Sequence, residues 1–338
     1  MVSSFNRILV LGHSNSILSD GWLSYFKKQI LADYLNFSIG GSPSPALLMR
    51  VLLNEGKIKD VDLVIIEPCV IDHGEEWQDP QAIYKHAVIL IDYFQSKGIS
   101  VILLAIPRNS EAVDKKTRGM MSWIKAATDY KIAYLDCTNS IKNFSITNGV
   151  NLELCWRDNM GHLTADVQSF VADDLIYKLA NINLNMSAKL SKDLFKVITA
   201  KMLFEYSEGS ELIERKSSFD SSLCISLKVN STILVDVLPQ FLVYGLLLNY
   251  GEMSSNDRSI ITFLTGDEST EVPVQNKFSA KLPSRKFLAM YRSITPLKDV
   301  SKITIPLENN SAYLESGANR IEIIGILIGK PLSEVLIN

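Results

Sequence analysis

The first half of the chain alternates short apolar runs with stretches of helical period. The apolar runs cover residues 7–11, 35–39, 62–66, 100–106 and 132–136, and polar or Gly/Pro-containing loops follow them. Apolar residues recur at helical spacing over residues 22–34, 81–97, 117–130 and 165–180. This alternation is typical of a parallel sheet covered by helices on both faces. We therefore predict an α/β domain over residues 1–185.

The pattern changes near residue 185, where helical segments give way to closely spaced strands. The strands expected beyond this point cover residues 223–229, 232–237, 241–250, 259–265, 286–293, 302–307 and 319–328, with Asn, Gly, Ser or Pro between them. Short strands at such spacing predict an all-β sandwich, which we expect to be jelly-roll-like. Residues 189–206 fit a helix or a strand. A chain of 338 residues has room for two domains, and we place them at 1–185 and 186–338.

Composition narrows the range of partners. The formal net charge is -3 and basic residues do not cluster, so nucleic acid is not an expected partner. The most apolar stretch, residues 241–248, is far shorter than the roughly 18 residues of a membrane span, and the apolar run at 8–11 is too short for a signal-peptide core. The four cysteines lack CxxC spacing, which argues against a metal site or disulfide framework. We expect a cytoplasmic protein without a metal cofactor, and the oligomeric state is left open.

Two segments carry residues suited to acyl-transfer chemistry. The first predicted strand is followed by Gly-His-Ser-Asn-Ser at residues 12–16, where a turn from strand to helix exposes the hydroxyl of Ser14. About 150 residues later His162 follows Asp158. A serine, a histidine and an aspartate are the nucleophile, base and orienting group of a catalytic triad. Ligands bind at the carboxyl ends of parallel strands, where Ser14, Gly41 and Asp72 all fall.

Over residues 5–180 these segments resemble the SGNH (GDSL-type) hydrolases, which have a flavodoxin-like α/β/α fold. The family's first block, Gly-Asp-Ser, is similar to residues 12–14 with His13 in place of aspartate, which implies that Ser14 is the nucleophile. The second block resembles residues 36–42 and implies that the backbone N–H of Gly41 joins that of Ser14 in an oxyanion hole.

The third and fourth blocks depart from the family pattern. Ile71 stands where the family has an oxyanion-hole asparagine, and loss of one such donor costs on the order of 3 kcal/mol of transition-state stabilisation. Asn15 and His73 are candidate substitutes, and Asp72 is expected to support the loop. The family's aspartate three residues before the histidine is here Asn159, while Asp158 lies one residue earlier. Either could orient His162; we favour Asp158 because it carries charge.

The resemblance implies a Ser14–His162–Asp158 acyl-enzyme mechanism. It leads us to expect an esterase or O-acyltransferase acting on a carbohydrate, with acetyl as the acyl group and a place in surface-polysaccharide assembly. A transferase would take its acyl group from a donor such as acetyl-CoA. The alternative is a weak or inactive SGNH-like carbohydrate-binding or scaffold protein, for which Ile71 and Asn159 are the evidence.

Structural explanations also exist for the individual residues. Ser14 could cap the following helix, and His162 could be a surface histidine in front of one. His13 and His73 could be solvent-exposed neighbours, while His86 falls within a predicted helix and is expected to be structural.

Overall fold

The computed structural model describes eleven stretches of the chain, which form two compact units. They are residues 5–40, 43–68, 79–113, 116–158, 161–181, 194–216, 221–235, 237–249, 258–275, 289–305 and 320–331. One unit comprises residues 1–192 with 336–338, and the other comprises residues 193–335. The predicted boundary at 185/186 lies outside the described residues.

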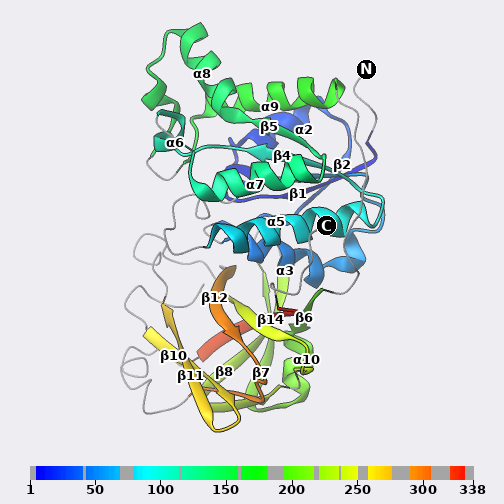
Figure 1. The fold of residues 1–338 in the computed structure, drawn as a ribbon, viewed down its shortest axis with the longest axis vertical. Coiled ribbons are helices and arrows are strands. Elements are labelled where there is room, and N and C mark those ends of the chain that lie inside the picture. The colour runs from blue at the N-terminus through cyan, green and yellow to red at the C-terminus, as the bar shows by residue number, and fades with distance from the viewer. Residues whose placement is uncertain are drawn as a thin grey trace. The chain divides into compact units, whose positions relative to one another are not determined.

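The N-terminal unit is built on a sheet of five parallel strands (Figure 1). They are β1 (Arg7–Leu11), β2 (Asp33–Asn36), β3 (Leu63–Ile66), β4 (Ser100–Ala105) and β5 (Ala133–Asp136), in the order β2-β1-β3-β4-β5. This is the flavodoxin-like order. The central strands β1, β3 and β4 are almost wholly buried, as expected where helices cover both faces of a parallel sheet. The predicted fold class is confirmed.

Helices lie on both sides of this sheet, with α8 and α9 on one side and α5 on the other in Figure 1. The helices of the unit are α1 (Ser14–Ile17), α2 (Trp22–Gln29), α3 (Pro45–Leu53), α5 (Pro80–Gln95), α6 (Asn109–Val113), α7 (Arg118–Asp129), α8 (Cys137–Asn148) and α9 (Ala165–Ala180), with short 3-10 turns η1 (Glu55–Lys57) and η2 (Leu152–Cys155). Three begin at a side chain that accepts a hydrogen bond from the first turn: Asp79 before α5, Thr117 before α7 and Asp136 before α8.

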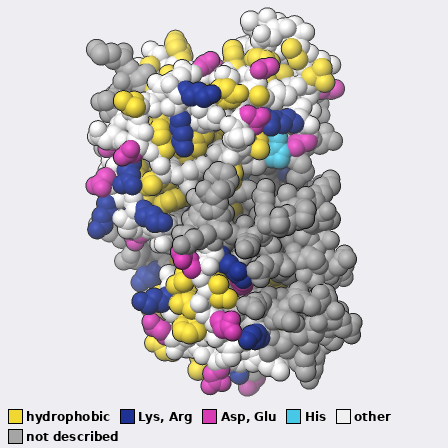
Figure 2. All heavy atoms as spheres, turned by 180° about the vertical axis from the view of Figure 1, so that it is seen from behind, with side chains coloured by type: hydrophobic (Ala, Val, Ile, Leu, Met, Phe, Trp, Pro, Cys, Tyr) yellow, Lys and Arg dark blue, Asp and Glu magenta, His cyan; other side chains and the backbone are white. Residues whose placement is uncertain are grey.

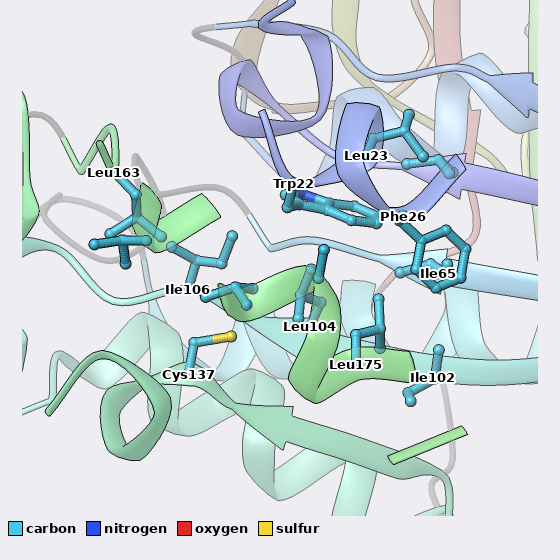
Figure 3. Packing of buried hydrophobic residues seen from close by; sticks show 14 of the residues in the cluster. Trp22, Leu23, Phe26, Ile65, Ile102, Leu104, Ile106, Cys137, Leu163 and Leu175 are labelled. Atoms are coloured by element: carbon cyan, nitrogen blue, oxygen red, sulfur yellow. The ribbon is translucent and has the colours of Figure 1, made fainter. Parts of the chain in front are cut away.

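A tryptophan and a phenylalanine fix α2 to the sheet. Figure 3 shows Trp22 and Phe26 among Ile65, Leu104 and Leu175, which come from β3, β4 and α9. Both aromatic side chains are fully buried, and their rings meet edge to face with centroids 6.0 Å apart. Each contributes about 1.5–3 kcal/mol through burial, which anchors the segment that follows Ser14.

The boundary between α2 and β2 differs from the one that the sequence periodicity predicts. The helix expected over 22–34 ends at Gln29, and the strand expected over 35–39 is instead β2 at Asp33–Asn36. Pairing with β1 aligns Arg7 with Asp33 and Val10 with Asn36, so hydrogen bonding to the neighbouring strand overrides the apolar pattern of the segment.

In its described residues the C-terminal unit is all-β apart from one short helix, in keeping with the all-β prediction. Its elements are β6 (Phe195–Thr199), α10 (Ala200–Glu205), β7 (Ser207–Lys216), β8 (Ser221–Leu234), β9 (Leu242–Asn249), β10 (Arg258–Thr265), β11 (Glu268–Gln275), β12 (Ala289–Leu297), β13 (Lys302–Thr304) and β14 (Arg320–Gly329). The described strands pair antiparallel in the order β11-β10-β13-β8-β14-β9-β12, with β6 on β14 and β7 on β8. β8 runs through the predicted strand at 223–229 and most of the one at 232–237, and Asn230 between them has φ 66°.

Charged side chains are mixed on the surface. On the face in Figure 2, the coloured Lys and Arg side chains are interspersed with Asp and Glu. None of the helices in the described stretches is both long and apolar enough to cross a membrane.

Acid should destabilise the N-terminal unit through His86, a buried residue of α5. Burial lowers the pKa of His86 to about 4 from its ordinary value of 6.5. Between these values the unfolded chain binds the proton and the native chain does not, so this contribution to stability is lost as pH falls through the window. We expect the free energy of unfolding, measured with urea, to fall between about pH 7 and pH 4 in both proteins. The fall should be up to about 3 kcal/mol larger in wild type than in His86→Gln. Equal losses in the two proteins would contradict this.

Candidate active site

The turn after β1 places Ser14 at the start of α1. His13 precedes this helix at its N-cap position, and its side chain makes no cap hydrogen bond there. Its ring is buried instead, with Nδ1 2.7 Å from the carbonyl oxygen of Ile39. Gly12 donates its N–H to Ser38 Oγ at 2.9 Å and accepts from the Ile39 N–H at 3.0 Å. The chain leaving β2 therefore holds the serine turn, and His13 is not the exposed neighbour that the alternative interpretation predicted.

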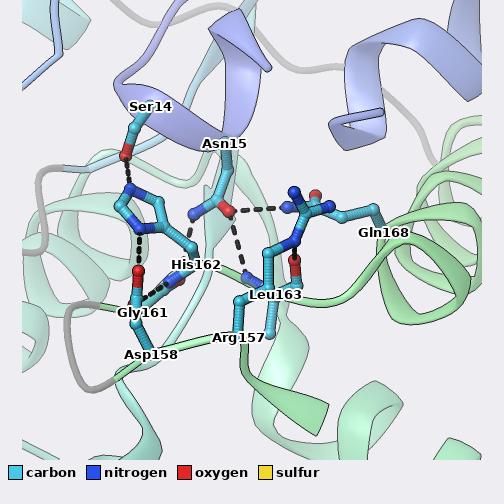
Figure 4. A network of polar contacts seen from close by, with 8 residues as sticks. All are labelled: Ser14, Asn15, Arg157, Asp158, Gly161, His162, Leu163 and Gln168. Atoms are coloured by element: carbon cyan, nitrogen blue, oxygen red, sulfur yellow. Dashed lines mark hydrogen bonds and ion pairs between the residues drawn. The ribbon is translucent and has the colours of Figure 1, made fainter. Parts of the chain in front are cut away.

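Ser14, His162 and Asp158 form a continuous hydrogen-bonded chain (Figure 4). Ser14 Oγ lies 2.6 Å from His162 Nε2, and His162 Nδ1 lies 2.6 Å from Asp158 Oδ2. An ionised carboxylate can only accept hydrogen bonds, so Asp158 favours the tautomer of the neutral imidazole that carries its proton on Nδ1. Nε2 is then free of a proton and accepts a hydrogen bond from the serine hydroxyl. The serine hydroxyl contacts the histidine rather than capping α1. This arrangement can deprotonate Ser14 as it attacks an electrophile.

The loop that carries His162 is closed by backbone and side-chain hydrogen bonds. Arg157 N–H donates to the His162 carbonyl at 2.8 Å, and Arg157 Nε donates to the Leu163 carbonyl at 2.7 Å. Its Nη2 pairs with Asp20 at 2.7 Å, and this contact holds the pKa of Asp20 below its usual value. Gly161 adopts φ 96°, in the region that favours glycine. This loop conformation places the Asp158 carboxylate beside the imidazole ring of His162. The same carboxylate also accepts a hydrogen bond from the backbone N–H of His162 at 3.3 Å.

Asn15 joins the histidine loop to the serine turn. Its Nδ2 donates to the Gly161 carbonyl at 3.2 Å, and its Oδ1 accepts from the Leu163 N–H at 3.3 Å and from Gln168 Nε2 at 2.6 Å. The Asn15 side chain therefore ties the two segments together, and its role as a substitute for the missing oxyanion-hole donor stays a prediction.

Several residues expected at the site lie outside the described residues. They are Gly41, Ile71, Asp72, His73 and Asn159. The second oxyanion-hole donor therefore stays a prediction, as does any role of Asn159. Within the described stretches, no group of three His, Cys, Asp or Glu side chains is arranged to hold a metal ion.

Two buried polar residues of the site were missed from the sequence. Gln168 of α9 is fully buried and accepts the Trp22 N–H at 2.9 Å. Glu67 follows β3, is 1% exposed, and accepts from Ser16 Oγ and Trp22 Nε1. Burial raises the pKa of the Glu67 carboxyl, while these hydrogen bonds act in the opposite direction. The only sequence signal for Glu67 is a charged residue that closes an otherwise apolar strand.

Glycine at position 12 permits close packing beneath the serine. A Cβ there would lie 2.2 Å from Ser16 Oγ and 2.9 Å from Glu67 Oε2, both of them buried atoms. We therefore expect Gly12→Ala to lower the free energy of unfolding by about 1–3 kcal/mol and to reduce any esterase activity. Urea unfolding against Gly56→Ala is the matched comparison, because a Cβ on Gly56 would meet nothing within 4 Å. Equal free energies of unfolding for the two variants would show that the turn accommodates a Cβ at position 12 and would contradict this prediction.

No family model and no curated protein matches the sequence. Among solved structures, a two-domain esterase active on acetylated mannans matches 96% of this chain and 91% of its own, with a TM-score of 0.62 and 15% identity. A lipase/acylhydrolase from Enterococcus faecalis, 13% identical, covers 55% of this chain and 100% of its own at a TM-score of 0.43. A member of the lipolytic G-D-S-L family from Veillonella parvula, 14% identical, covers 52% of this chain and 99% of its own at a TM-score of 0.41.

The first of these comparisons carries the likeness in fold. At 15% identity it shows shared architecture, namely an α/β unit followed by a further unit. The chain shares the fold of that two-domain esterase, and the fold implied by the resemblance in the sequence blocks is confirmed.

Proposed function

We propose that the protein is a serine-dependent esterase that removes acetyl groups from a carbohydrate. The observation that carries the proposal is the chain of two 2.6 Å contacts from Ser14 Oγ through His162 to Asp158. The carbohydrate is inferred from the structural neighbour described as active on acetylated mannans, which matches nearly the whole chain. The retained hydrogen-bonded chain favours an enzyme over the binding-protein alternative.

In the proposed mechanism Ser14 Oγ attacks the ester carbonyl carbon while His162 Nε2 takes the hydroxyl proton. The tetrahedral oxyanion is held by the N–H of Ser14 and, by the sequence resemblance, of Gly41. His162 returns the proton to the departing sugar oxygen, leaving an acetyl ester on Ser14. Water deprotonated by His162 then attacks this ester, and acetate leaves as Ser14 regains its proton. Asp158 holds the ring orientation and stabilises its cationic form throughout.

A transferase would share the first half of this mechanism. A sugar hydroxyl would replace water as the acceptor, and acetyl-CoA or another activated ester would supply the acyl group. The proposed role in surface-polysaccharide assembly belongs with this version. Transfer is distinguished from hydrolysis by incubating the acyl-enzyme with acceptor sugars and measuring the ratio of acetylated sugar to acetate.

The test of the proposal is acetate release from acetylated manno-oligosaccharides, with Ser14→Ala as the blank. Acetylated xylo-oligosaccharides and p-nitrophenyl acetate report whether the activity follows the sugar or the ester. Serine-dependent acetate release from either oligosaccharide supports the proposal. Absence of release from all three substrates would contradict it, and release from p-nitrophenyl acetate alone would contradict the carbohydrate assignment.

A further inference from the structure

A buried carboxylate lies directly beneath the serine turn. Glu67 is the first residue after β3, is 1% exposed, and its backbone N–H donates to the Leu11 carbonyl at 2.8 Å. Its backbone is therefore tied to the last residue of β1, two positions before His13 and three before Ser14. The proposed mechanism gives this carboxylate no role.

Two donors from the segment around the nucleophile converge on the Glu67 carboxylate. They are the hydroxyl of Ser16 and the indole N–H of Trp22, the latter at 2.9 Å. An ionised carboxylate offers about four lone-pair sites and no donor, which suits this set. A buried polar group costs free energy unless it is hydrogen-bonded, so these two donors constrain the turn together.

The same network extends to the histidine. Asn15, the chain neighbour of Ser16, donates to the Gly161 carbonyl and accepts from the Leu163 N–H and from Gln168, which in turn accepts the Trp22 backbone N–H. Gly161 and Leu163 are the two neighbours of His162 in the chain. The carboxylate and the base are therefore linked through Ser16 and Trp22, which contact Glu67, and through Asn15, which contacts the histidine loop.

We propose that Glu67 is a positioning residue that fixes Ser14 relative to His162 by holding the serine turn and, through Asn15, the histidine loop. This inference rests on the proposed esterase function for its kinetic consequence. Glu67 does not touch the reacting atoms. Its expected effect is on the geometry of attack, where a misplacement of about 1 Å can cost about 100-fold in rate.

The test is Glu67→Gln, which keeps the size of the side chain but turns a donor group toward the donors of the turn. We expect kcat for p-nitrophenyl acetate to fall about 10- to 100-fold while KM changes less than about twofold. Glu111→Gln is the matched control. Glu111 is also buried, and it accepts from the N–H groups of Arg108 and Thr117 in another loop. This control should keep its kcat within about twofold of wild type.

Hydrogen exchange supplies a readout that does not depend on activity. Peptides covering residues 13–22 and 161–168 should exchange faster in Glu67→Gln, and the peptide covering 108–117 should exchange faster in Glu111→Gln. If Glu67→Gln fails to fold, Trp22→Phe and Ser16→Ala each remove one donor and should each lower kcat by a smaller factor.

The outcomes separate the two proposals. A wild-type protein that hydrolyses no ester contradicts the proposed function, and exchange then decides the positioning role alone. An active wild type with unchanged kcat in Glu67→Gln, or with a raised KM at unchanged kcat, would overturn the positioning role. Unchanged exchange at 161–168 would overturn the link to the histidine loop.

Discussion

Replacing Ser14 by alanine is expected to lower kcat for ester hydrolysis by at least about 10³-fold. The hydroxyl that contacts His162 Nε2 at 2.6 Å would be lost, and with it the covalent route through an acyl-enzyme. Initial rates with p-nitrophenyl acetate, measured on freshly purified variant and wild type, give the comparison directly.

Ser16→Ala is the matched control for this experiment. Ser16 lies on the same short helix, is buried, and donates its hydroxyl to Glu67. Its loss should reduce kcat by about 10-fold or less, because it disturbs the turn without removing the nucleophile. Similar losses in the two variants would mean that the activity does not depend on Ser14 as a nucleophile.

Asp158→Asn is expected to lower kcat by about 10² to 10³-fold with a small change in KM. The amide retains the shape of the carboxylate but lacks the charge that holds the Nδ1 proton and stabilises the imidazolium. Because the Asp158 side chain is 40% exposed, water can partly take over its hydrogen bond to the ring. We therefore expect a smaller fall in kcat than the roughly 10⁴-fold fall that the same substitution causes in a buried triad.

Asn159→Ala decides between the two candidate partners of His162. The family pattern would assign the orienting role to position 159, whereas the described geometry brings Asp158 to the ring. We expect Asn159→Ala to keep kcat within about threefold of wild type. A large loss in Asn159→Ala together with an active Asp158→Asn would reverse the assignment.

Much of the fold could be predicted because its signals are local. β1 begins and ends at the predicted residues, and α9 covers residues 165–180 as its periodicity indicates. The position of β2 could not be predicted this way, because pairing with β1 sets it. The sequence also did not show that the chain continues as one strand, β8, through Asn230, which has a left-handed conformation between two predicted strands.

Some residues of the candidate site could likewise be predicted from local sequence, and others could not. Ser14, His162 and Asp158 were predicted from residue type and chain order, and the structure brings the three together. Glu67 and Gln168 were missed because their partners lie 45 to 153 residues away in the sequence. The contacts that Asn15 makes were missed for the same reason, since its bonds to the histidine loop become visible only in three dimensions.

The central claim is tested most directly by trapping the acyl-enzyme. Rapid acid quenching after mixing with p-nitrophenyl acetate, followed by intact-mass measurement and peptide mapping, would reveal a covalent acetyl group. We predict one acetyl group per chain, located on the peptide that contains Ser14 and absent from Ser14→Ala. Ester hydrolysis by wild type with acetylation at another residue, or persisting in Ser14→Ala, would contradict the account.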